Sequence, residues 1–167
     1  MRLNRLASAA LAAVAISVPV SAVAGTAFAG TAQAATKKAP VTWNMVAAAK
    51  AKQLVGYRYI YGGNTIRGFD CSGLTQWVYK HAGHGKAINR TANEQFRQFK
   101  RISKQDARTG DLVFFHETSS LSSYVYHVGV YEGGNDMVAA TTSGGTVEFQ
   151  SFTWAGNTVT FGTITHQ

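Results

Sequence analysis

Gly68-Phe69-Asp70-Cys71-Ser72-Gly73-Leu74 holds the only cysteine of the 167-residue chain. Apolar or small residues recur from there at intervals of three or four, at Cys71, Leu74, Val78 and Ala82, which predicts a helix that begins near the cysteine. The first turn of a helix offers free N–H groups and the positive end of the helix dipole. The sequence therefore predicts a lowered pKa for Cys71 and a nucleophilic sulfur. The alternative is a small buried apolar residue, which a lone cysteine often is.

A nucleophilic cysteine works with a base, and His127 is the candidate. It opens His127-Val128-Gly129-Val130-Tyr131, whose alternation predicts a strand, and Gly129 leaves room for another group to come close. A buried structural histidine is the alternative, but beside Cys71 the residue is predicted to act as general base. The remaining histidines lie near turns or element ends, where exposure is expected: His81, His84, His116 and His166.

Four blocks of the chain, in this order, resemble those of the NlpC/P60 family of cell-wall cysteine endopeptidases. They are Tyr59-Ile60-Tyr61-Gly62-Gly63, Phe69-Asp70-Cys71-Ser72-Gly73-Leu74, Gly110-Asp111-Leu112-Val113-Phe114-Phe115 and His127-Val128-Gly129-Val130-Tyr131. The resemblance covers about residues 46 to 165. It implies a papain-like core in which the cysteine helix packs on an antiparallel sheet that carries the histidine.

The order of the predicted elements agrees with this fold class. Helices precede a run of strands, which indicates an α+β domain with N-terminal helices packed on a C-terminal antiparallel sheet. Helices are expected at 42–54, 71–82 and 91–99, the last opened by the capping box Thr91-Ala92-Asn93-Glu94. Tyr57 to Gly63 is expected to be extended, with its three tyrosines on one face. Strands are expected at 112–115, 124–131, 136–142, 145–151 and 158–165, and connecting segments at 100–108 and 117–124.

Residues 1–34 have the composition of a secretory signal peptide. Two arginines in Met1–Arg5 precede an apolar run, and Ala-x-Ala sites follow it. A transmembrane anchor is the alternative, but polar residues and a proline interrupt the run. We expect cleavage after Ala34, a short basic linker at 35–41 and a catalytic domain at 42–167. The protein is then secreted, extracellular or cell-wall associated, without stable membrane insertion.

The charge of the chain limits its partners. The formal net charge of +8 becomes +6 once the signal peptide, with two arginines and no acid, is removed. No phosphate loop, zinc-ligand set or aromatic–basic stacking motif occurs, so we expect no nucleic acid, metal or cofactor. The natural partner of a basic exported protein is the anionic cell wall and its peptidoglycan. A monomer is expected.

The resemblance also implies an activity, hydrolysis of an amide bond in peptidoglycan stem peptides by Cys71 and His127. The tyrosine that corresponds to Tyr59 stands beside the nucleophile in the family and helps to hold substrate, and we assign Asp70 and Ser72 to substrate binding with it. Two alternatives remain open: an N-acyl amidase or acyltransferase on the same core, and a catalytically silent wall-binding module.

One position departs from the family pattern. Twelve residues after the catalytic histidine the family usually has a third polar residue, often histidine, which orients the first; this chain has Ala139 there. Thr141, on the same strand face, is the nearest substitute. A backbone carbonyl or a water molecule are the other two possibilities.

Overall fold

The computed structural model describes residues 42–120 and 122–164, so the predicted signal peptide, the whole predicted linker and His166 lie outside the described residues. The helices of the described part are α1 (Trp43–Gln53), α2 (Cys71–His81) and α3 (Ala92–Gln98), with a short 3₁₀ segment at Thr153–Thr158. Each of the three α-helices begins where the sequence predicts, because Thr42, Asp70 and Thr91 accept hydrogen bonds at their N-termini.

A six-stranded sheet follows the helices in sequence. Its strands are β3 (Lys100–Ile102), β4 (Leu112–His116), β5 (Val125–Gly133), β6 (Asp136–Ala140), β7 (Val147–Ser151) and β8 (Val159–Thr163). They pair antiparallel in the order β3-β8-β4-β5-β6-β7. A small hairpin of β1 (Asn64–Thr65) and β2 (Gly68–Phe69) stands apart from this sheet.

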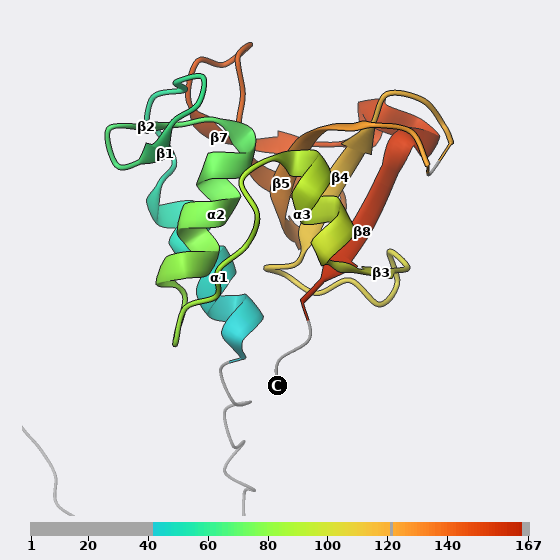
Figure 1. Cartoon of the computed structure of the whole chain (residues 1–167), viewed down its shortest axis with the longest axis horizontal. Helices are drawn as coiled ribbons and strands as arrows, with labels where there is room; N and C mark the ends of the chain where they lie inside the picture. Colours follow the sequence, from blue (N-terminus) through green and yellow to red (C-terminus); the bar gives the residue numbers. More distant parts are fainter. Residues whose placement is uncertain (1–41, 121, 165–167) are drawn as a thin grey trace, which may run out of the picture. The chain divides into compact units, whose positions relative to one another are not determined.

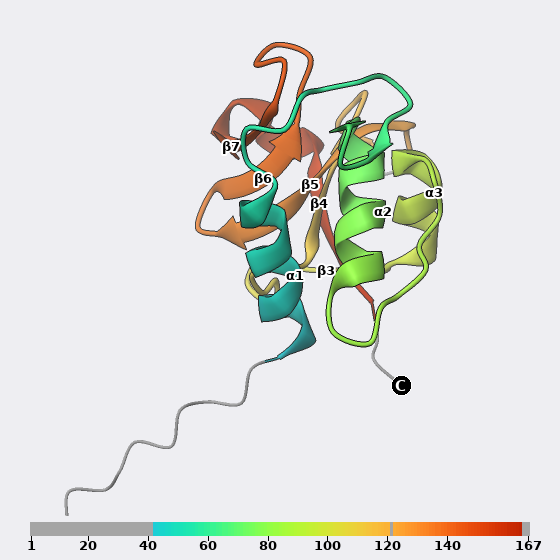
Figure 2. The same cartoon turned by 90° about the vertical axis from the view of Figure 1, so that its left-hand side faces the viewer.

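The two faces of the sheet are covered differently. All three helices lie against one face, where Leu112, Phe114 and Val128 meet the apolar sides of the helices (Figures 1 and 2). On the other face a second cluster gathers Phe115, Met137 and Ala139 with residues of the 3₁₀ segment and its neighbours. The α+β prediction, with N-terminal helices on a C-terminal antiparallel sheet, is confirmed.

Strand β3 was not predicted, because residues 100–108 were expected to be a connecting segment, and for Lys100–Ile102 this prediction is wrong. Lys100–Ile102 pairs with β8 at the edge of the sheet, and the side chains of Lys100 and Arg101 are exposed. A polar edge strand shows no apolar alternation, so only its partner identifies it.

The segment before the hairpin is less regular than predicted. Arg58 and Tyr59 form single bridges to Thr146 and Phe69, and the three tyrosines do not share a packed face, since Tyr61 is 91% exposed. A second error concerns His116, which is buried: its ring nitrogens lie 3.2 Å from the carbonyl oxygen of Ser123 and 2.9 Å from Oγ1 of Thr160.

Two glycines explain how closely α2 is held. A Cβ on Gly73 would collide with the carbonyl oxygen of Gly63, so the helix can approach the preceding loop only with glycine there. Gly83 follows the end of α2 with φ +53°, a left-handed conformation that favours glycine. Within the described residues no helix is long and apolar enough to span a membrane.

Candidate active site

Cys71 is the first residue of α2, immediately after the cap Asp70, whose Oδ1 accepts a 2.6 Å hydrogen bond from the Gly73 N–H. Its sulfur also accepts hydrogen bonds from the backbone of Ser72 and of Val128. Val128 directly follows His127 on β5. The start of α2 therefore meets β5 beside His127, the residue predicted to act as general base.

Cys71 and His127 line one cavity of about 320 Å³. Tyr59 and Thr141, both predicted site residues, line it too. Three further lining residues were not among the predicted site residues: Tyr126, Gln150 and Trp154. Four other hollows of the described part are larger, about 1050, 770, 580 and 470 Å³, but none of them contains the cysteine. The chemistry of the lining residues, and not size, makes the small cavity the candidate active site.

The environment of Cys71 raises the pKa of its thiol. Burial is the largest cause and the Asp70 carboxylate the second, while the hydrogen bonds from Val128 and Ser72 act in the opposite direction and are outweighed. The prediction of a lowered pKa is therefore wrong. It rested on the helix start alone, and the residue that caps that helix is an anion next to the sulfur.

Burial also lowers the pKa of His127, from 6.5 to about 4. The ring lies beside two aromatic side chains that also lie near each other: its centroid is 5.1 Å from that of Phe115 and 6.5 Å from that of Tyr126, and these two are 6.5 Å apart. The structure thus favours a neutral thiol beside a neutral imidazole near pH 7, rather than a thiolate–imidazolium ion pair.

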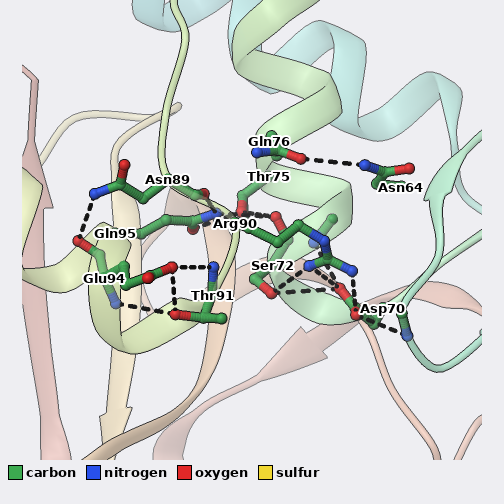
Figure 3. A network of polar contacts seen from close by, with 12 residues as sticks. Asn64, Asp70, Ser72, Thr75, Gln76, Asn89, Arg90, Thr91, Glu94 and Gln95 are labelled. Carbon is green, nitrogen blue, oxygen red and sulfur yellow. Dashed lines mark hydrogen bonds and ion pairs between the residues drawn. The ribbon is translucent and has the colours of Figure 1, made fainter.

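A polar network supports the cysteine side of the cavity (Figure 3). Arg90 donates to both carboxylate oxygens of Asp70, from Nη1 to Oδ1 at 3.0 Å and from Nη2 to Oδ2 at 2.6 Å, and to Oγ of Ser72 at 3.0 Å. Gln95 of α3 donates to the Ser72 carbonyl at 2.9 Å and accepts from Thr75 at 2.7 Å. The predicted residues Asp70 and Ser72 thus lie beside Cys71, but their polar atoms are engaged with Arg90.

Arg90 holds this network together. It lies 20 residues from Asp70 in the chain, directly before the capping box that opens α3. Because the box fixes the start of α3, it also fixes where Arg90 points. An arginine before a capping box, in a chain whose nucleophile is flanked by an aspartate, is the signal that was available.

Tyr59 lines the cavity near the cysteine, and the pKa of its phenol is raised by burial and by the nearby Cys71 and Asp70. Its backbone N–H donates to the carbonyl oxygen of Gly145 at 2.8 Å, which ties this loop to the β6–β7 turn. The position beside the nucleophile agrees with the prediction, whereas its part in substrate binding stays a prediction.

On the histidine side, Ala139 is fully buried in the cluster behind the sheet. Thr141 lines the cavity, yet its hydroxyl donates to Oε1 of Glu148 at 2.6 Å and accepts from the Gly144 N–H at 3.2 Å. In the described part of the chain the His127 ring makes no hydrogen bond to either residue. The same residues contain no cluster of three or more His, Cys, Asp or Glu side chains suited to a metal ion.

A cysteine at the start of a helix, packed against an antiparallel sheet that carries a histidine, places the domain in the papain-like class of α+β folds. The sequence model of the NlpC/P60 family matches residues 56–162, and the chain belongs to this family. The fold and the four sequence blocks described above thus indicate the same family.

Several known proteins are similar to this chain. It is 40% identical over 117 residues to the bifunctional muramidase/DL-endopeptidase CwlT of Bacillus subtilis, covering 69% of this chain and 35% of that protein. It is 40% identical over 92 residues to the murein DD-endopeptidase MepS/murein LD-carboxypeptidase of Escherichia coli, covering 55% and 46%. The crystal structure of the NlpC/p60 domain of the peptidoglycan hydrolase SagA has a TM-score of 0.63 and 28% identity, covering 74% of this chain and all of that domain. The chain therefore spans less than half of each of these two curated relatives.

Proposed function

We propose that this protein is a secreted cysteine endopeptidase that hydrolyses an amide bond in the stem peptides of peptidoglycan. The observation that carries the proposal is the shared cavity of Cys71 and His127, with the sulfur held by the backbone of the residue next to the histidine. The peptidoglycan-acting relatives support the substrate, and the signal-like sequence at residues 1–34 supports export. Residues 42–167 are the proposed catalytic domain.

The reaction follows from the neutral pair. Sγ of Cys71 attacks the substrate carbonyl carbon while the imidazole of His127 takes the thiol proton, so the thiolate forms only as the new bond forms. The backbone N–H of Cys71, at the start of α2, is placed to stabilise the oxyanion. His127 then gives its proton to the leaving amine. Water, with His127 again as base, cleaves the thioester and returns the thiol.

We further propose that packing, more than a hydrogen bond, orients His127. Phe115 and Tyr126 form an aromatic cluster with the ring, and a histidine that stays neutral needs no anionic partner to stabilise a resting imidazolium. Of the three possibilities for an orienting group, Thr141 is the least favoured, because its only proton goes to Glu148. A backbone carbonyl or a water molecule can add to the packing.

Tyr59, which lines the cavity, and Asp70 and Ser72, which are buried beside Cys71 behind the lining, form the proposed substrate-binding side. The Arg90–Asp70 pair leaves this side strongly polar, although the two charges largely compensate each other. A peptide with both charged and amide groups suits such a surface better than an apolar acyl chain does. This favours a peptidase over the acyltransferase alternative.

The test is digestion of purified peptidoglycan by the mature protein, with the fragments identified by mass. We expect new stem-peptide termini with the wild type and a loss of at least about 10³-fold in rate with Cys71→Ser and with His127→Gln. Thr118→Ala, in the exposed loop before β5, is the matched control and should hydrolyse like the wild type. Acyl groups moved to an acceptor would support a transferase. Wall binding without any product would support the silent module.

A further inference from the structure

The charges of the domain are segregated along the chain. Between residues 42 and 93 there are seven lysines and arginines and a single acid, Asp70, for a net charge of +6. Between residues 94 and 164 there are five basic and seven acidic side chains, a net of −2. Asp70 is paired with Arg90, so no acid of residues 42–93 offsets the other six basic side chains there. Residues 42–93 therefore carry nearly all of the attraction for anions.

Part of this charge surrounds a cavity that the proposed reaction does not use. The cavity, of about 770 Å³, lies between hairpin strand β1, the C-terminal half of α2 and the loop at 84–88. Its volume is in the range of ordinary ligand sites. No carboxylate lines it, and two lysines and two histidines do: Lys80, His81, His84 and Lys86.

Hydrogen bonds hold the walls of this cavity in place. Asn64 Nδ2 of β1 donates to Gln76 Oε1 of α2 at 3.3 Å (Figure 3). Gln76 Nε2 donates to the Ile88 carbonyl at 2.9 Å. Lys86 donates its backbone N–H to the Tyr79 carbonyl at 2.8 Å, which folds the loop back on the helix. Gly85 permits this turn with φ +73°, and a Cβ there would lie 2.7 Å from the Lys80 carbonyl oxygen.

His81 is also fixed. Its ring stacks on Trp77, with centroids 4.0 Å apart and an interplanar angle of 25°, and Nδ1 lies 2.7 Å from the Trp77 carbonyl oxygen. A carbonyl only accepts, so Nδ1 carries the hydrogen, and this bond holds the ring in one orientation as a wall of the cavity. The C-terminal end of α2 is itself negative, so an anion binds on the flank formed by the side chains and not on the helix axis.

We propose that this cavity binds a wall-linked polymer of polyol phosphates. The lysines of this cavity are compact point charges, and lysine commonly binds phosphate oxygens in this way. A flexible polyol chain can follow a concave site that a rigid nucleic-acid duplex cannot enter. The choice of a wall polymer rests on the proposed function, but the anion site itself does not.

The site is separate from the reaction. Helix α2 has 11 residues, so at about 1.5 Å per residue His81 lies about 15 Å from Cys71 along the axis. A polymer bound there leaves the catalytic cavity open. It would hold the enzyme on the wall while stem peptides enter beside Cys71.

Fluorescence anisotropy with labelled poly(glycerol phosphate), over a salt series, tests the site without any turnover. Lys80→Gln/Lys86→Gln should weaken binding at least about tenfold and reduce the slope of log K against log salt by about two, one for each lost contact. Lys100→Gln/Lys104→Gln removes the same charge from the other half and should change binding less than about threefold. Lys80→Gln alone, at an exposed position, should lower the slope by about one if the double variant folds poorly.

Equal losses in both double variants would overturn the proposal in favour of general charge attraction. Tighter binding of polyglutamate would overturn the choice of phosphate, and tighter binding of duplex DNA would overturn the choice of a polyol chain. Cleavage of a soluble stem peptide should be the same in Lys80→Gln/Lys86→Gln as in the wild type, while cleavage of polymer-bearing wall should fall. If no stem peptide is cleaved by any variant, the proposed function fails while the binding result still decides the anion site.

Discussion

The two sides of the catalytic cavity are built by different forces. Around Cys71 the chain uses charge and directed hydrogen bonds: Asp70 caps the helix, pairs with Arg90 and accepts the Gly62 N–H at 3.0 Å. Around His127 it uses aromatic packing, and Ala139 behind the sheet offers no polar group. One side positions its residue by specific bonds, the other by shape. Both sides nevertheless disfavour ions at the reacting pair.

Replacing Asp70 should have the largest effect on the polar side of the cavity, measured as a loss in the free energy of unfolding. Asp70→Asn keeps a good cap but loses the charge that holds Arg90, and we expect a loss of about 1–2 kcal/mol in the free energy of unfolding, because Arg90 remains partly exposed. Asp70→Ala should lose about 1 kcal/mol more, since the cap goes too. Urea unfolding measures both. Asp106→Asn, at an exposed carboxylate, is the control, and a loss as large there would show that the pair contributes nothing.

On the histidine side of the cavity, we expect the stability of the fold to depend on pH. With a pKa of about 4 in the folded protein and about 6.5 unfolded, His127 binds fewer protons when folded, so its contribution to stability falls as pH drops from 6.5 to 4 and is constant below. The loss is at most about 3 kcal/mol, because the side chain keeps some exposure to solvent. Wild type minus His127→Gln, in unfolding experiments at pH 7 and pH 4.5, isolates the effect. An unchanged difference between the two pH values would contradict the buried neutral histidine.

The smallest expected effect concerns Thr141. Thr141→Val removes the bond to Glu148 and should lower kcat less than about fivefold, because the hydroxyl does not contact the histidine ring. Tyr126→Leu, which removes one aromatic wall, should lower kcat more than Thr141→Val while KM changes little. The reverse order would indicate that a hydrogen-bond relay through Thr141, and not packing, orients His127.

The contrast between the two sides also explains what the sequence could predict. The start of α2, the capping box of α3 and the hairpin turns at Gly133-Gly134 and Gly144-Gly145 are local, so a few neighbouring residues determine them. The Arg90–Asp70 pair joins residues 20 positions apart, and nothing in either segment alone specifies it. The predictions of an exposed His116 and of a lowered pKa for Cys71 were wrong for the same reason. Burial depends on which distant elements cover a residue, and burial reverses the pKa expected from position in a helix.

The titration of Cys71 tests the central claim, that the reacting pair is neutral before substrate binds. The rate of alkylation by iodoacetamide should keep rising with pH beyond about 8.5, the ordinary pKa of a cysteine, because burial and the Asp70 carboxylate raise the pKa of this thiol. Asp70→Asn should shift the curve to lower pH, since the second of these causes is removed. A rate that reaches its plateau between about pH 5 and 7, and loses that plateau in His127→Gln, would show a preformed thiolate–imidazolium pair and contradict the account.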